Sequence, residues 1–167
     1  MTPTTSRFRI QFALGAFACI ALMGYALYAQ YVLHLEPCPL CIFQRIAICA
    51  LGWVFLLGAL IGPKSAGGQR TWSVLALLMA LAGIAVAARH LWLQSLPPDQ
   101  VPACGPGLGY MWDAMPFGKL LAKVFTGSGE CAAIPWRFLG LAMPGWVLIC
   151  FVVLGGWALF AGFKRRA

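Results

Sequence analysis

Four long apolar runs, separated by shorter polar segments, dominate the chain. They cover residues 11–33, 43–62, 71–91 and 144–163. Each run is close to the ~20 residues that an α-helix needs to cross the hydrocarbon core of a bilayer. Breaks at Gly62-Pro63, Pro97-Pro98 and Met143-Pro144 separate the runs. The pattern predicts a single all-α membrane domain over residues 1–167, a four-transmembrane-helix bundle whose loops 34–42 and 92–143 share one side.

Composition agrees with a membrane protein. Of the 167 residues, 62% are hydrophobic and 10% are charged, and the mean hydropathy is +0.84. Soluble domains keep about 25% of their residues charged, so lipid must be the solvent for most of this chain. The net charge of +8 could suggest nucleic-acid binding, but the basic residues stand in small groups at the edges of the apolar runs. That placement indicates membrane topology instead.

The charged residues sort by loop. Arg7 and Arg9 precede the first run, Lys64 and Arg70 lie between the second and third, and residues 164–166 are all basic. The four carboxylates, Glu36, Asp99, Asp113 and Glu130, all fall in loops 34–42 and 92–143. The positive-inside rule therefore predicts that both termini are cytoplasmic and both of these loops extracytoplasmic. The first run is too long for the apolar region of a signal peptide, so we expect it to be retained.

The seven cysteines divide into two groups. Cys19, Cys49 and Cys150 fall within apolar runs, where a thiol usually packs as a small apolar side chain. The other four lie in the extracytoplasmic loops, where disulfides can form and persist: Cys38, Cys41, Cys104 and Cys131. This group makes thiol chemistry the leading hypothesis.

The segment Cys38-Pro39-Leu40-Cys41 stands where the second span begins. With Cys38 at or near the N-cap, Pro39 takes the first helical position, which proline favours, and Cys41 falls in the first turn. Unpaired amides and the helix dipole at this position favour a thiolate. Arg45 follows one turn later and is always charged, although an arginine here could also simply reach toward lipid headgroups. The motif predicts that Cys41 holds negative charge.

Other uses of these residues stay open at this point. A structural zinc site would take Cys38, Cys41, Cys104 and Cys131, but the second pair lacks the short spacing usual in zinc sites. Covalent haem would require His directly after the second cysteine, where Ile42 stands. His34 and His90 lie near the outer ends of their spans and could in principle ligate haem, although interfacial histidines are commoner. We predict no metal site.

Loop 92–143 carries an amphipathic stretch at residues 117–125, with Lys119 and Lys123 on its polar face. Such a stretch predicts a short helix lying flat on the bilayer, which would keep Cys131 near Cys38 and Cys41. The alternative is a short soluble helix packed on the bundle.

Taken together, these features resemble the DsbB family of disulfide-generating membrane proteins. The resemblance covers nearly the whole chain. It rests on the four spans, on Cys104, and on the stretches Cys38-Pro39-Leu40-Cys41-Ile42-Phe43-Gln44-Arg45, Arg89-His90-Leu91-Trp92-Leu93-Gln94, Ser128-Gly129-Glu130-Cys131 and Phe138-Leu139-Gly140-Leu141-Ala142-Met143-Pro144.

The resemblance implies a monomeric thiol:quinone oxidoreductase of the bacterial inner membrane. Such a protein reoxidises the periplasmic thioredoxin-fold oxidase DsbA and passes electrons to ubiquinone or menaquinone, and this route is an established example of the chemistry. It implies that DsbA attacks Cys104, that the released Cys131 attacks Cys38, and that Cys41 faces the quinone. Arg45 and His90 would border the quinone ring.

One position departs from the family pattern. Many relatives carry Glu directly before this arginine, whereas Gln44 stands here. A proton-handling role for that carboxylate is therefore in doubt for this chain. The pattern also leaves open a paralogue that serves a dedicated thiol oxidant instead of a general DsbA.

Overall fold

The computed structural model describes residues 3–97, 99–101, 116, 118–119, 129–134 and 136–163. Four long helices carry the fold: α1 (Pro3–Tyr31), α2 (Pro39–Ile61), α3 (Ala66–Gln94) and α7 (Met143–Phe163). Each is long and apolar enough to span a membrane, which confirms the predicted all-α, four-span architecture. A short helix, α6 (Gly129–Ala132), and two strands, β1 (Arg137–Phe138) and β2 (Leu141–Ala142), precede α7. Most of the expected interfacial helix at 117–125, including Lys123, lies outside the described residues.

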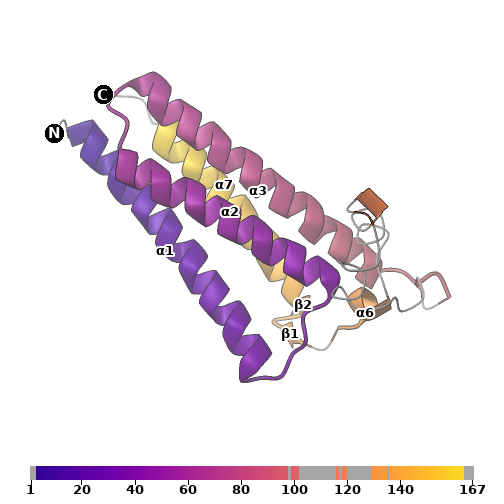
Figure 1. Cartoon of the computed structure of the whole chain (residues 1–167). Coiled ribbons are helices and arrows are strands. Elements are labelled where there is room, and N and C mark those ends of the chain that lie inside the picture. Colours follow the sequence, from indigo (N-terminus) through magenta and orange to yellow (C-terminus); the bar gives the residue numbers. More distant parts are fainter. Residues whose placement is uncertain are drawn as a thin grey trace.

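The long helices form one bundle (Figure 1). Along the bundle α1 packs against α2, α2 against α3 and α3 against α7, while α7 also contacts α1. The start of α1 and the end of α7 lie at the same end of the bundle, and α6 and the two strands lie at the opposite end (Figure 1). This arrangement collects the residues that follow α1 and those that precede α7 at one end.

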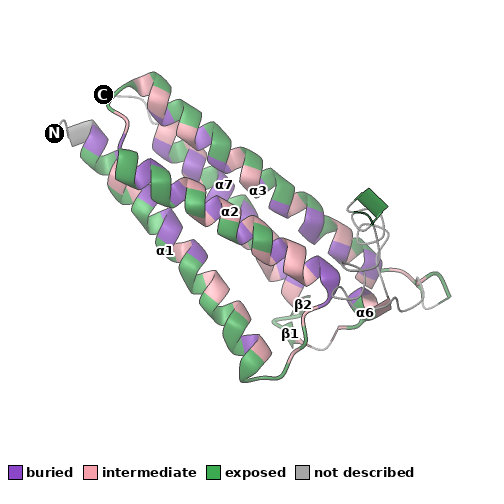
Figure 2. Cartoon of the chain, in the orientation of Figure 1, coloured by how far each residue is buried: buried purple, intermediate pink, exposed green. Residues whose placement is uncertain are grey.

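Burial separates an inner face from an outer face on each helix (Figure 2). The inner core is aromatic near the start of α1, where the rings of Phe8 and Phe12 stack at 4.1 Å and Phe12 meets Phe55 at 5.1 Å. Large apolar side chains such as Phe17 and Trp53 are exposed on the outside. Apolar surface of this extent marks a face covered by another apolar phase, which for four membrane-length helices is lipid.

The ends of α2 follow from local sequence. Cys38 is the N-cap, with φ −68° and ψ 165°, and Pro39 occupies the first turn, which confirms the predicted start of the second span. At the other end Gly62 adopts φ 55°, a left-handed conformation that glycine accepts without steric cost. Its N–H donates to the carbonyl oxygen of Gly58 at 3.0 Å and closes the last turn.

Loop 92–143 ends in a tight hairpin directly before α7, and the hydrophobic pattern does not predict this hairpin. Strands β1 and β2 are antiparallel, with Phe138 opposite Leu141. The two residues between them, Leu139 and Gly140, have φ values of 50° and 81°, as a two-residue type I′ turn requires. The indole N–H of Trp146 in α7 donates to the carbonyl oxygen of Phe138 at 3.1 Å and ties the hairpin to the bundle.

Candidate redox site

The thiols of Cys38 and Cys41 meet at the first turn of α2. Their sulfur atoms are 3.2 Å apart, and the backbone N–H of Cys41 donates to the sulfur of Cys38 at 3.4 Å. Capping by Cys38 therefore places its sulfur over the amides that open the helix, where a negatively charged sulfur is stabilised. The pair is close enough to exchange between thiol and disulfide with little movement of the backbone.

A third cysteine reaches this pair from the long loop. Cys131, in α6, is 1% exposed and packs with Cys38 and Leu40 of α2 and with Val86 and Leu93 of α3. This small apolar cluster is separate from the main core of the bundle. The predicted proximity of Cys131 to the first pair is therefore present in the structure.

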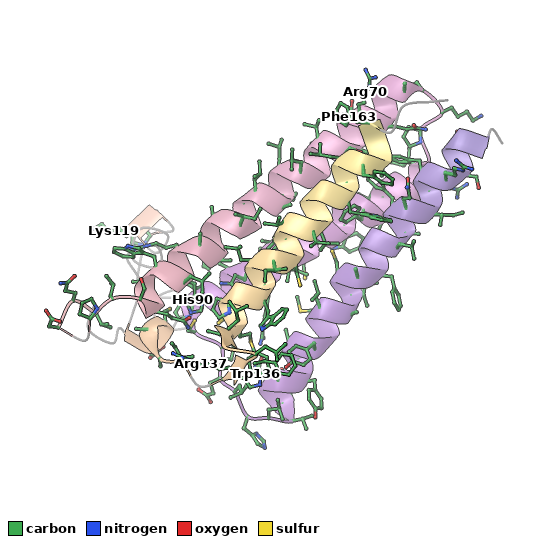
Figure 3. The ribbon with its side chains drawn as sticks, turned by 180° about the vertical axis from the view of Figure 1, so that it is seen from behind. Arg70, His90, Lys119, Trp136, Arg137 and Phe163 are labelled. Carbon is green, nitrogen blue, oxygen red and sulfur yellow. The ribbon has the colours of Figure 1, made fainter. Side chains whose placement is uncertain are left out.

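His90, on α3, contacts residues of α2 and α6. It is 2% exposed on α3, and its Nδ1 lies 3.1 Å from the side-chain nitrogen of Gln44 on α2. Its Nε2 lies 3.0 Å from the carbonyl oxygen of Cys131 and 3.8 Å from the sulfur of Cys38. In Figure 3, His90 lies at the same end of the bundle as Trp136 and Arg137, whereas Arg70 and Phe163 lie at the far end. The imidazole is therefore surrounded by thiol-bearing segments.

The same side chains could in principle bind a metal. The ligand atoms of Cys38, His90 and Cys131 lie within 4.8 Å of one another and are buried. Ligation would require the Nε2 atom of His90 to lose a proton and its contact with the Cys131 carbonyl. The carbonyl oxygen 3.0 Å from Nε2 can only accept, so this contact favours a hydrogen on Nε2 and competes with metal ligation.

Arg45 lies one turn beyond Cys41 and points toward α1. Its guanidinium donates to the side-chain oxygen of Gln30 and, at 3.0 Å, to the carbonyl oxygen of Ala26. Both acceptors are neutral, so these contacts fix the position of the guanidinium without cancelling its positive charge. The side chain is held within the bundle, in contrast to one that extends freely into the headgroup region.

A cavity of about 460 Å³ joins these groups. Cys38, Cys41, Arg45 and His90 all line it. Its remaining walls come from the end of α1, the start of α7, and the hairpin, including Tyr25, Trp136, Phe138, Trp146 and Cys150. The volume falls in the range of about 300–1,000 Å³ that is typical of sites for small organic molecules.

Sequence reasoning missed several residues of this site. Gln30 and Ala26, which hold Arg45, are separated from it by a loop, and no local pattern connects them. The aromatic wall carries a weak signal, because Tyr and Trp gather at the interfacial ends of membrane helices. Cys150 lines the cavity although it was expected only to pack, Cys19 is buried in the core, and Cys49 is exposed on the outer face of α2. Cys104 lies outside the described residues.

These features define a multi-pass membrane protein with a cluster of thiols beside a small-molecule cavity at one end of its bundle. A family model described as "Disulfide bond formation protein DsbB" matches residues 8–161. The chain therefore belongs to the DsbB family, which confirms the resemblance drawn from the sequence, and it is a disulfide-forming oxidoreductase.

Bacterial relatives named "Disulfide bond formation protein B" match over most of their length. The relative from Xanthomonas campestris pv. campestris (strain 8004) is 51% identical over 166 residues, which is 99% of this chain and 96% of the relative. The relative from Nitrosococcus oceani is 53% identical over 144 residues, covering 86% of this chain and 85% of the relative. The relative from Hahella chejuensis is 50% identical over 157 residues, or 94% of each chain.

Proposed function

We propose that this protein reoxidises a periplasmic thioredoxin-fold dithiol oxidase of the DsbA kind and passes two electrons to a membrane quinone. It thereby sustains disulfide bond formation in periplasmic proteins. One observation carries the proposal: the Cys38 and Cys41 sulfurs, 3.2 Å apart, adjoin both Cys131 and the cavity. Electrons arriving from the long loop would thus reach a lipid-soluble acceptor through two neighbouring thiols.

The first half of the relay is thiol-disulfide exchange. At rest Cys104 is paired with Cys131, and Cys38 with Cys41. A thiolate of reduced DsbA attacks the sulfur of Cys104, which forms a mixed disulfide and releases Cys131 as a thiolate. Cys131 then attacks the sulfur of Cys38, and the bond between Cys38 and Cys41 breaks. The electron pair leaves on Cys41, beside the cavity.

The second half restores both pairs. The second thiol of DsbA attacks its own mixed disulfide and releases Cys104. Cys104 attacks Cys131, which reforms their disulfide and releases Cys38 as a thiolate. Closure of the disulfide between Cys38 and Cys41 would give up two electrons to a bound quinone, and the two protons lost by the DsbA thiols would balance that reduction. DsbA ends oxidised, and both cysteine pairs of this chain return to their starting state.

The residues around the cavity fit a quinone ring. The walls are largely aromatic and aliphatic, and Arg45 supplies a positive charge whose hydrogen-bond partners are neutral. A bound quinone supplies a strong two-electron acceptor, which is needed because DsbA is itself a strong oxidant at about −120 mV. Ubiquinone and menaquinone both meet this requirement.

We place the protein in the bacterial inner membrane, with both termini cytoplasmic and the thiol end in the periplasm. Support comes from Arg9 and Arg70, which lie on the segments at the end of the bundle opposite the thiols. Alkaline phosphatase fused after Asp99 should be active in cells, and the same enzyme fused after Lys64 should be inactive. Equal activity of the two fusions would contradict this orientation.

Two measurements test the relay. Purified protein in lipid nanodiscs, mixed with reduced DsbA and quinone, should reduce the quinone, and Cys41→Ser should abolish this reaction. Cys49→Ser, on the outer face of the same helix, is the matched control and should keep full turnover. DsbA lacking its second thiol should be trapped on Cys104, and if only another periplasmic thioredoxin-fold protein is trapped, the partner is a dedicated one. Unchanged turnover in Cys41→Ser would refute the relay.

A further inference from the structure

The protonation of His90 can be read from its two partners. The carbonyl oxygen of Cys131 can only accept a hydrogen bond, and it lies 3.0 Å from Nε2 of His90. Nε2 must therefore carry a hydrogen. A neutral imidazole has one N–H, so Nδ1 is an acceptor. The group 3.1 Å from Nδ1 is the side-chain nitrogen of Gln44, which can only donate. Both contacts thus fit the same Nε2–H tautomer.

Burial makes this choice of tautomer costly to reverse. Gln44 and His90 are 4% and 2% exposed, so water cannot readily replace either partner. With the opposite tautomer, the lone pair of Nε2 would face the carbonyl oxygen of Cys131. Its Nδ1–H would also face the amide hydrogens of Gln44. Each mismatch leaves a buried polar group unsatisfied.

The fixed N–H is also directed close to a reacting sulfur. The sulfur of Cys38 lies 3.8 Å from Nε2 of His90, slightly beyond the Cys131 carbonyl. In the proposed relay, Cys38 leaves as a thiolate when Cys104 takes back Cys131. At that moment the bond between Cys131 and Cys38 breaks, and the electron pair stays on Cys38. A neighbouring N–H donor stabilises this charge by a charge-assisted hydrogen bond.

From this geometry we infer that Gln44 is a positioning residue. Its amide holds His90 as the Nε2–H tautomer, and His90 in turn holds Cys131 against Cys38 and stabilises Cys38 as it leaves. The inference rests on the proposed relay, in which Cys131 and Cys38 form a transient disulfide. It gives Gln44 a role that does not require a proton-transferring carboxylate at this position.

The first test observes the tautomer directly. The chain contains two histidines, so ¹⁵N-histidine labelling gives two imidazole spin systems, and His34→Asn assigns them. We expect His90 to show a protonated Nε2 and an unprotonated Nδ1 in the unchanged protein at neutral pH. Gln44→Met, which keeps the length but removes the donor, should shift the Nδ1 resonance toward that of an acceptor without a hydrogen bond and raise the population of the Nδ1–H tautomer. A protonated Nδ1 in the unchanged protein would overturn the inference.

The second test measures the step that depends on this N–H. Rapid acid quenching and thiol alkylation during turnover with reduced DsbA report the lifetime of the disulfide between Cys131 and Cys38. Gln44→Met should lengthen that lifetime about 10- to 100-fold, as expected for one lost hydrogen bond to a charged group. The matched control is Gln69→Met. Gln69, on α3, is buried like Gln44, but it donates to the Pro63 carbonyl at the far end of the bundle.

The two failures are distinguishable. If the unchanged protein never forms the disulfide between Cys131 and Cys38, the relay is wrong, and the proposed role of Gln44 is refuted with it. If that disulfide forms but has the same lifetime in Gln44→Met, the relay stands and the positioning role is refuted. Should Gln44→Met fail to fold, Gln44→Glu replaces it. A carboxylate there should give His90 a second N–H, and an unchanged spectrum would contradict the inference.

Discussion

Removing the positive charge of Arg45 should slow quinone reduction strongly. Arg45 lies one helical turn from Cys41, and residues at this spacing have Cβ atoms about 5–6 Å apart. For charges on side chains at this spacing we take a separation of about 6–8 Å between the guanidinium and the Cys41 thiolate. At an effective dielectric constant of about 20, this separation stabilises the thiolate by about 2–3 kcal/mol. Arg45→Met should therefore lower turnover about 30- to 100-fold.

The assay should follow quinone absorbance after stopped-flow mixing with reduced DsbA. Arg45→Lys keeps the positive charge, so it should recover most of the lost rate. Recovery should be incomplete because lysine cannot reach both Gln30 and Ala26 as the planar guanidinium does. Gln30→Met keeps the arginine but removes one of its acceptors. Its loss of turnover should lie between the losses in Arg45→Lys and Arg45→Met. Thermal unfolding of each variant checks that the bundle is intact.

Two outcomes would refute the reasoning. Turnover of Arg45→Met within about 3-fold of the unchanged protein would show that its charge contributes little to the reaction. Arg45→Lys as slow as Arg45→Met would show that the shape of the guanidinium matters and its charge does not. Because the side chain is held inside the bundle, added salt should change these ratios only weakly.

Two further predictions concern packing and the cavity wall. An added Cβ at Gly58 would lie 2.6 Å from a ring carbon of Phe12, so Gly58→Ala should destabilise the bundle by about 1–3 kcal/mol in a detergent unfolding assay. Gly24→Ala, with nothing within 4 Å, is the control, and equal losses would contradict the prediction. Trp146→Phe removes the indole donor to Phe138, so the KM for quinone should rise several-fold with little change in thermal stability; an unchanged KM would show that this contact does not shape the cavity.

The sequence predicts the helices well because a single physical constraint governs them. Lipid requires long apolar helices with all backbone groups paired, and the hydropathy pattern reads this requirement directly. The start of α2 is predicted equally well, because Cys38 and Pro39 carry local capping signals. The site is less visible in the sequence, since its contacts join residues from different helices.

The contacts of Gln44 and Arg45 illustrate what the sequence leaves undetermined. In the sequence Gln44 is only a departure from a family pattern, whereas in the structure it pairs with His90 on α3. Arg45 is visible as a charge near Cys41, but its partners Gln30 and Ala26 depend on how α1 leans on α2. The hairpin before α7 was also missed, because a two-residue turn that places Leu at positive φ lacks the usual Asn-Gly signal.

Burial of Cys38 and Cys131 limits which thiols can reduce the protein. Cys38 and Cys131 are both buried, and attack on a disulfide requires access to the sulfur. Direct attack on Cys38 by a small thiol from solution is therefore disfavoured in this arrangement, and in the proposed relay reduction arrives through Cys131. In the proposed relay Cys104 must then reach the sulfur of Cys131 while Cys131 is still bonded to Cys38. The hydrogen bond from His90 to the Cys131 carbonyl acts on both events, because a weaker contact would admit outside thiols and a stronger one would delay recovery.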